Sequence, residues 1–98
     1  MSDAREQWSK ALFNNVHFLA VAHALGTGPR ETDARELQAA LKLSQPAVHR
    51  VLVNLEAVAL IERLAREGRT SPQRYRRVRH PFWKAAEALA LSAANRSE

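Results

Sequence analysis

The sequence has no cysteine, which excludes a disulfide, a thiolate metal site and a thiol nucleophile. Long apolar runs are missing as well. The two longest, residues 18–22 and 57–61, have five residues each, whereas a membrane-spanning helix needs about 18 or more. The first six residues show no apolar segment behind a basic one, so no secretory signal is predicted. We therefore expect a cytoplasmic protein that has no contact with a membrane.

Signatures of catalysis are absent too. The chain has only three glycines, and it contains neither a phosphate-binding glycine loop nor a nucleophile elbow. The four histidines are scattered. His17 and His23, for example, lie about 240° apart around a helix and cannot share a metal ion on one face. We expect no enzymatic activity, no metal site and no cofactor.

The charge of the chain is concentrated in one segment. With 98 residues, 46% of them apolar and 26% charged, the chain suits one domain with a single core. The net charge is +5, and basic and acidic side chains balance in residues 1–60 and again in residues 81–98. The excess lies in residues 61–80, which hold seven arginines and two glutamates. Such a cluster is typical of a surface that binds a polyanion, and the alternative is a solvated face.

Apolar spacing predicts helices in the first 60 residues. Residues 3–25 contain no Gly or Pro and follow the helical period, although Asn14-Asn15 could divide them into two helices, and residues 26–29 end the segment. Thr32 or Asp33 can cap a short helix ending near residue 43, and Asp33 followed by Glu36 has capping-box spacing. Ser44-Gln45-Pro46 is typical of a helix start. The expected buried stripe of this third helix is Val48, Val51, Leu52, Leu55 and Val58.

The apolar period then shortens towards two. This change predicts a β-hairpin over residues 60–79 with a six-residue tip at residues 67–72. A last helix is expected over residues 81–95, and its segment 85–94 contains six alanines and two leucines, so it needs a partner surface. The predicted fold class is mainly α with a small β-hairpin, in one domain spanning residues 1–98.

Two short helices joined by a three- or four-residue turn form a helix-turn-helix, and a basic hairpin follows them here. The segments Leu43-Ser44-Gln45-Pro46-Ala47-Val48-His49-Arg50 and Leu55-Glu56-Ala57-Val58-Ala59-Leu60-Ile61 resemble those of winged-helix DNA-binding regulators, above all the small ArsR- and MarR-like bacterial repressors. The resemblance covers about residues 14–80. It implies a helix-turn-helix at about 33–58 and a wing at about 60–79. A C-terminal helix at about 81–95 is expected from its own composition, and both terminal helices are expected to serve dimerisation. The implied function is a dimeric, sequence-specific transcriptional repressor associated with a prokaryotic nucleoid.

Two positions depart from the pattern of these families. They often have Gly in the turn where this chain has Lys42, and again before the first wing strand where it has Ala59. A left-handed backbone at such a position costs a residue other than Gly about 1–2 kcal/mol. The ligand clusters of ArsR-type metal sensors are also missing, so metal sensing is not expected.

The chemistry of DNA selects the candidate contact residues. An α-helix fits the major groove, where Arg pairs with guanine and Gln with adenine through two hydrogen bonds. The residues expected to contact DNA from the third helix are Ser44, Gln45, Ala47, His49, Arg50 and Asn54. Those expected from the wing are Arg66, Arg69, Thr70, Arg74 and Arg76, with Arg69 at the tip. For Arg50 the alternative is a surface ion pair with Glu56 or Glu36.

The terminal helices carry more apolar surface than a monomer of this size should expose, which predicts a homodimer. The expected contacts are Trp8, Leu12, Phe82, Trp83 and Leu89. Two other functions stay open beside a regulator of transcription. One is a DNA-binding protein of a plasmid or chromosome that serves replication, partition or architecture, and the other is a winged helix that contacts only proteins. The sequence identifies no small-molecule effector.

Overall fold

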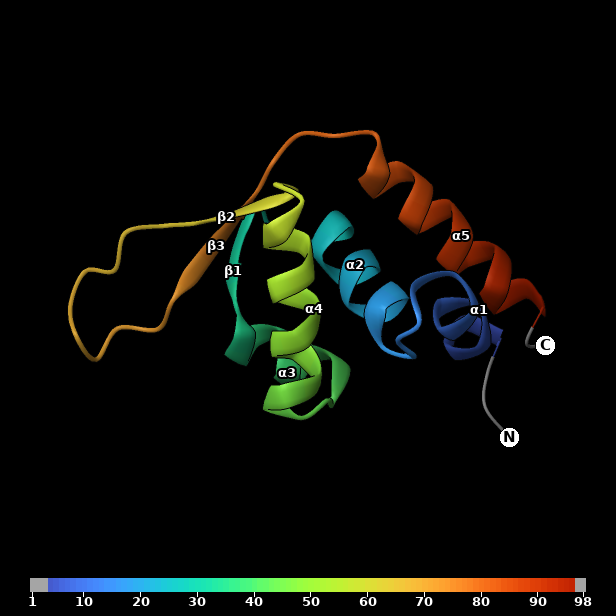
Figure 1. Cartoon of the computed structure of the whole chain (residues 1–98), viewed down its shortest axis with the longest axis horizontal. Helices are drawn as coiled ribbons and strands as arrows, with labels where there is room; N and C mark the ends of the chain where they lie inside the picture. Colours follow the sequence, from blue (N-terminus) through green and yellow to red (C-terminus); the bar gives the residue numbers. More distant parts are fainter. Residues whose placement is uncertain (1–3, 97–98) are drawn as a thin grey trace.

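The computed structural model describes residues 4–96, which form five helices and a small three-stranded antiparallel sheet (Figure 1). The helices are α1 (Ala4–Phe13), α2 (Phe18–Thr27), α3 (Ala34–Leu41), α4 (Gln45–Ala57) and α5 (Phe82–Arg96), and the strands are β1 (Glu31–Asp33), β2 (Ile61–Arg63) and β3 (Arg74–Arg77). The protein is mainly α-helical, as the sequence predicts. No helix within residues 4–96 is both long and apolar enough to span a bilayer.

The N-terminal apolar segment is divided into two helices at its asparagines. Asn14 adopts a left-handed backbone with φ of 56°, which a short polar side chain tolerates. The side chain of Asn15 accepts a hydrogen bond of 2.8 Å from the backbone N–H of His17. Ser9 of α1 is fully buried, and its hydroxyl accepts a 2.9 Å hydrogen bond from the N–H of Leu19. These bonds hold the start of α2 against α1.

The core is built on α2 and α4. Leu19 and Val21 of α2 are fully buried, and this helix packs against α5 on one side and against α1, α3 and α4 on others. Four members of the predicted stripe of α4 are buried: Val48, Val51, Leu52 and Leu55. The prediction for Val58 is wrong, since its side chain is 65% exposed. The reason is that α4 ends at Ala57, so the helical period no longer directs residue 58 inward.

The sheet contains a strand that sequence reasoning missed. β3 lies in the centre and pairs with both β1 and β2 in antiparallel register, so that Thr32 faces Tyr75 and Glu62 faces Arg76. β1 has only three residues, and its partner is distant in the sequence. No alternating apolar pattern of useful length marks such a strand.

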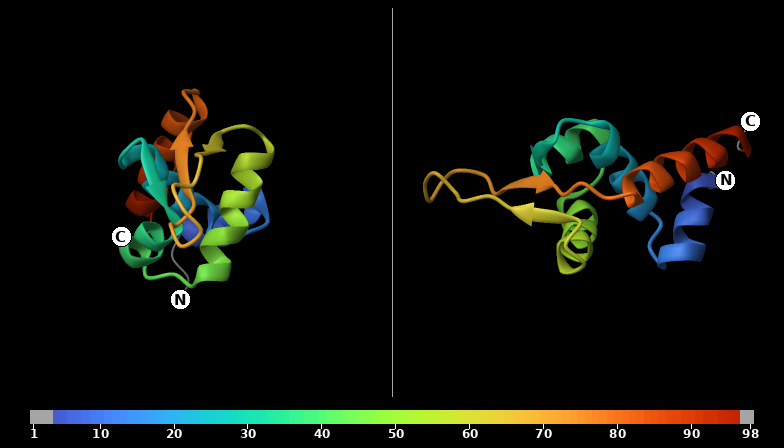
Figure 2. Two further views of the ribbon diagram at one scale, coloured as in Figure 1. Left: turned by 90° about the vertical axis from the view of Figure 1, so that its left-hand side faces the viewer. Right: turned by 90° about the horizontal axis from the view of Figure 1, so that it is seen from above.

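The hairpin of β2 and β3 projects away from the helices (Figures 1 and 2). The strands are shorter than predicted, and the connection spans residues 64–73 instead of six residues. We call these ten residues the tip. The guanidinium of Arg66 donates hydrogen bonds to the carbonyl oxygens of Ser71 at 2.7 Å and Arg69 at 2.9 Å. Arg66 therefore closes the tip on itself and gives it a defined shape.

Both positions at which winged-helix families often have Gly are left-handed here. The φ angle is 57° at Lys42, directly after α3, and 61° at Ala59, between α4 and β2. The backbone N–H of Lys42 donates to the carbonyl oxygen of Gln38 in α3. The N–H of Leu60 donates to the carbonyl oxygen of Leu55 at 3.0 Å. The turns thus form without Gly, at a cost of about 1–2 kcal/mol each that the surrounding packing offsets.

α5 agrees with the predicted range within one residue, but one of its aromatic residues has another role than expected. Trp83 is only 7% exposed, and its indole N–H donates to the carbonyl of Val78 at 2.8 Å. The ring packs beside Gly26 of α2, where an added Cβ would lie 3.4 Å from Trp83, at van der Waals distance. The expectation that a single chain exposes Trp83 for dimerisation is therefore wrong.

Candidate nucleic-acid interface

The start of α4 is set by its capping residue. The Ser44 hydroxyl accepts a 3.3 Å hydrogen bond from the N–H of Ala47, and Pro46 lies in the first turn. Asp33 caps α3 in the same way, accepting a 3.0 Å bond from the N–H of Glu36. The prediction of Ser44 as a cap is confirmed, and of the two candidates for α3, Thr32 and Asp33, the cap is Asp33. With the left-handed turn at Lys42 the two caps fix α3 and α4 as a packed pair.

A groove of about 530 Å³ lies between α3, α4 and the hairpin. Figure 2 (left) looks at this side of the molecule, with the hairpin pointing towards the viewer and α4 beside it. Cationic and polar side chains from all three elements line the groove: Arg35, Gln38, Gln45, His49, Arg63, Arg66 and Gln73. Their guanidinium and amide groups are the donors that bind phosphates and base edges in nucleic-acid complexes.

The predicted contact residues of α4 do not share one face. Gln45 and His49 line the groove, and both are exposed. Each residue turns the helix by about 100°, so Arg50 and Asn54 occupy a neighbouring exposed face, about 100° and 140° from His49. Ala47 is half-buried. The helix therefore offers one polar face to the groove and another to the solvent beyond it.

Arg50 does not form the ion pair that was the alternative to a DNA contact. Glu56 pairs with Arg63 at 2.9 Å, and Glu36 pairs with Arg74 at 3.2 Å. The hydrogen bond from Arg63 to Glu56, together with the charge of that carboxylate, raises the pKa of Arg63 above its ordinary value. Arg50 has no ion pair or hydrogen bond through its side chain to any residue in the range 4–96, so its guanidinium is available to a ligand.

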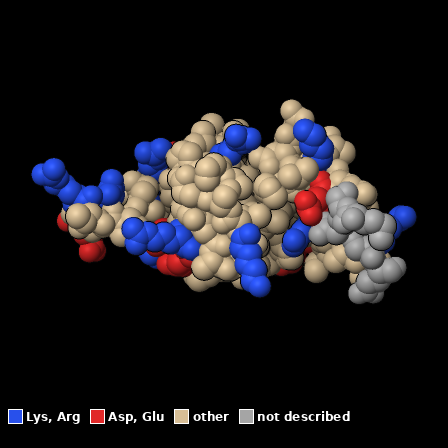
Figure 3. All heavy atoms as spheres, turned by 90° about the horizontal axis from the view of Figure 1, so that it is seen from below, with Lys and Arg blue, Asp and Glu red and all other residues tan. Residues whose placement is uncertain are grey.

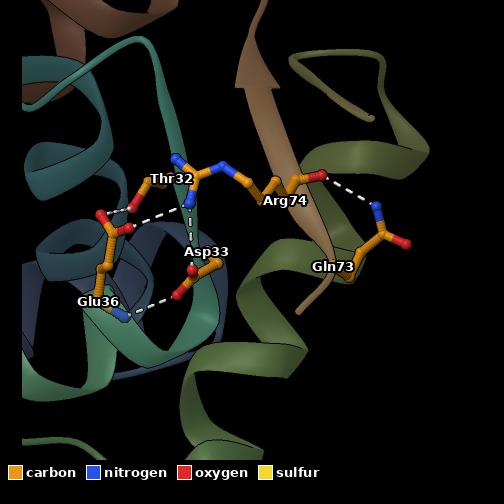
Figure 4. Close-up of polar contacts among 5 residues, drawn as sticks. All are labelled: Thr32, Asp33, Glu36, Gln73 and Arg74. Carbon is orange, nitrogen blue, oxygen red and sulfur yellow. Dashed lines mark hydrogen bonds and ion pairs between the residues drawn. The ribbon is translucent and has the colours of Figure 1, made fainter. Parts of the chain in front are cut away.

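The strand part of the hairpin, which we call the base, uses its arginines within the fold. Arg74 lies between Asp33, at 3.3 Å, and Glu36, at 3.2 Å, while the Thr32 hydroxyl donates to Glu36 at 3.0 Å (Figure 4). Arg76 forms an ion pair with Glu62 of the neighbouring strand. Two of the five wing residues predicted to contact DNA are therefore already paired with carboxylates.

The tip is different. The side chains of Arg69 and Thr70 are exposed and have no hydrogen bond or ion pair to the described residues. Arg66 is engaged with backbone carbonyls but still lines the groove. Seen from below, the Lys and Arg side chains are spread from the projecting hairpin across this face, with acidic groups among them (Figure 3). The surface is a series of separate cationic points and not one continuous basic patch.

Four of the polar groove residues are absent from the contacts predicted from the sequence: Arg35, Gln38, Arg63 and Gln73. Arg35 and Gln38 are three residues apart on α3, so helical spacing alone places them on one side. Gln73 precedes β3 and donates to the carbonyl of Leu64 at 2.8 Å, and no local pattern indicates that contact.

The predicted dimer residues are exposed to different degrees. Leu12 of α1 is 63% exposed, whereas Trp8, Phe82 and Leu89 are half-buried. Leu91, which was not predicted, is 53% exposed. It lies about 200° around α5 from Leu89, so both sides of this helix carry accessible apolar surface.

No protein-family model, curated protein or solved structure matches this chain. Within residues 4–96 no group of three or more His, Cys, Asp or Glu side chains is arranged to hold a metal ion.

Proposed function

We propose that the protein is a sequence-specific regulator of transcription that binds double-stranded DNA as a winged helix-turn-helix. The observation that carries this proposal is the groove in which α3, α4 and the hairpin bring cationic and amide side chains together. The order of elements supports it as well. The helix pair α3 and α4 lies between β1 and the β2–β3 hairpin, and β1 joins that hairpin in one sheet.

In this proposal α4 enters the major groove. That groove is about 12 Å wide, which suits a helix with a diameter of about 10–12 Å. Arg50 and Gln45 meet base edges, and the start of α4 at Ser44 lies against a phosphate. The tip then reaches the neighbouring backbone or minor groove with Arg69, whose planar guanidinium suits both.

The experiment that tests this proposal is selection of bound fragments from random double-stranded DNA, followed by titration of the selected site. We expect one consensus with two related halves. On that site Arg50→Ala should cost about 1–3 kcal/mol and relax the preference at one base position. Arg96→Ala removes the same charge at the end of α5 and serves as the matched control, with no effect on preference.

The other outcomes are equally informative. Binding without a consensus would replace the proposal by a role in chromosome or plasmid architecture. No binding to any duplex at low salt would leave a module for protein contacts and would overturn it. Binding that Arg50→Ala does not weaken, with sequence preference lost in Arg69→Ala, would make the hairpin the element that reads the bases.

We propose that two copies associate through α1 and α5. Leu12 and Leu91 add exposed apolar surface to helices that already lie together in the fold. Light scattering at tens of micromolar should give a dimer, and Leu12→Glu should give a monomer. Val58 is exposed to the same degree but lies after α4, so Val58→Glu is the matched control and should stay dimeric. A monomeric wild type would contradict the dimer and with it the two-part site expected one DNA turn apart.

A further inference from the structure

A second hollow lies at the other end of the sheet from the candidate DNA groove. Its volume is about 680 Å³, and it is formed by the end of α2, the end of β3 and the first turns of α5. The chain that arches from β3 to α5 forms part of its wall (Figure 1). Charged and titratable side chains dominate the lining: Arg30, Arg77, Arg79, His80, Lys84 and Glu87. We call this hollow the rear pocket.

The cations of the rear pocket are not neutralised by the protein. Arg30, Arg79 and Lys84 are exposed, and their side chains make no ion pair or hydrogen bond to a described residue. Glu87 is the one carboxylate among the described lining residues, so the lining carries a net charge of +3 with His80 neutral. At the base of the hairpin, by contrast, Arg63, Arg74 and Arg76 each face an acidic partner. Like charges gathered around a hollow repel one another unless an anion lies between them.

The walls of the rear pocket are held in place by contacts of their own. Arg77 donates hydrogen bonds to the carbonyl oxygens of Leu25 and, at 3.1 Å, of Gly28, where the end of the α2 dipole favours a positive charge. His80 accepts a 2.9 Å bond from the N–H of Phe82 at Nδ1, which leaves its Nε2 as the donor. Trp83 is fixed by its bond to Val78. The protein itself therefore holds these three wall residues in place.

We propose that the rear pocket binds a small anion with at least two negative charges, carried by phosphate or carboxylate groups. Its volume lies in the range of about 300–1,000 Å³ that is usual for small-molecule sites. Guanidinium groups bind both kinds of anion through paired, charge-assisted hydrogen bonds. The site is separate from the proposed DNA contacts, because it uses Arg77 and Arg79 at one end of β3, whereas the groove uses Gln73 and Tyr75 at the other.

The two tryptophans offer a direct test with the whole chain. Trp83 lines the rear pocket, whereas Trp8 lies on α1. In a nitrogen-15 NMR spectrum the indole N–H signal of Trp83 therefore reports on the pocket, and that of Trp8 reports on a position outside it. At low ionic strength, pyrophosphate and citrate are titrated in separate arms, with acetate as the monoanion. We expect a saturable shift of the Trp83 signal with pyrophosphate or citrate and no matching shift of Trp8. Whichever of the two binds more tightly identifies phosphate or carboxylate as the natural chemistry.

Two variants make the result specific. Arg79→Ala removes an exposed lining cation and should weaken binding at least about tenfold, because a charge-assisted contact is lost. Arg69→Ala removes the same charge from the tip and should leave the affinity unchanged.

Shifts of both indole signals without saturation, or equal affinity of Arg79→Ala and wild type, would overturn the proposal. A short duplex that competes with pyrophosphate for the Trp83 shift would instead make the pocket a DNA contact. Since the main titration contains no DNA, its outcome is independent of the proposed regulatory function.

Discussion

The base and the tip of the hairpin contain the same kind of residue in two different situations. At the base, Arg74 and Arg76 are paired with carboxylates and join the sheet to α3 or to the neighbouring strand. At the tip, the Arg69 side chain has no partner among the described residues. The arginine cluster of residues 61–80 is therefore not a uniform binding surface. Part of it stabilises the fold, and only the rest is available to a partner.

The acidic side chains decide which arginines belong to which group. Asp33, Glu36, Glu56 and Glu62 lie around the base and neutralise the arginines there. They are drawn from three separate parts of the chain. A count of charges along residues 61–80 leaves most of them out, so it overstates the positive charge that a ligand would meet.

The largest effect is expected when a contact at the base of the hairpin is lost. Asp33→Ala should lower the free energy of unfolding by about 1–2 kcal/mol, measured with a chemical denaturant. The change deletes the cap of α3, which contributes about 1 kcal/mol, and a partly exposed ion pair with Arg74, which contributes less. Glu31→Ala alters an exposed residue of the same strand and should change stability by less than about 0.5 kcal/mol. If both variants lost the same amount of stability, the contacts of Asp33 at the base of the hairpin would not contribute to stability.

The next prediction concerns the tip and rests on the proposed function. Arg69→Ala should weaken binding to selected and random DNA alike, by about 1 kcal/mol for one exposed phosphate contact, and should reduce the salt slope by about 0.9. Its unfolding free energy should stay unchanged. Arg76→Ala at the base should show the reverse: a stability loss below about 1 kcal/mol and an unchanged salt slope. If the two variants exchanged these effects, the division between base and tip would be wrong.

A smaller effect is expected from a substitution that stabilises the base of the hairpin and leaves the tip unchanged. Ala59 is left-handed where the chain enters β2, so Ala59→Gly should raise the free energy of unfolding by about 0.5–1 kcal/mol. The gain is less than the full strain because Gly loses more entropy on folding. Ala40→Gly lies inside α3 and should instead lower stability by about 1 kcal/mol. A loss of stability in both variants would show that the turn at residue 59 carries no strain.

The last prediction is that removal of metal ions has no effect. No group of three or more His, Cys, Asp or Glu side chains within residues 4–96 is arranged to hold a metal ion, so treatment with EDTA should change neither the unfolding free energy nor the affinity for DNA. Titrations before and after dialysis against the chelator provide the measurement. Loss of DNA binding that zinc restores would contradict this expectation.

Local signals determined much of the helical structure. Ser44 and Asp33 cap the helices that their spacing predicts, and Val51 and Leu55 are buried as the helical period requires. Caps and periodic apolar positions act over three or four residues, so a short segment contains the whole signal. The same holds for α5, whose observed start agrees within one residue with the predicted one.

The tertiary structure alone decided the rest. Arg74 faces Asp33 only because β1 pairs with β3, and Arg77 reaches the end of α2 only because the chain returns there. Likewise, Trp83 is a core residue because α5 packs against α2. The sequence by itself determined that seven arginines stand in residues 61–80 and that helices flank them. Which arginines are free and which are paired depends on residues far apart in the chain, since an ion pair requires proximity in space that no local pattern encodes.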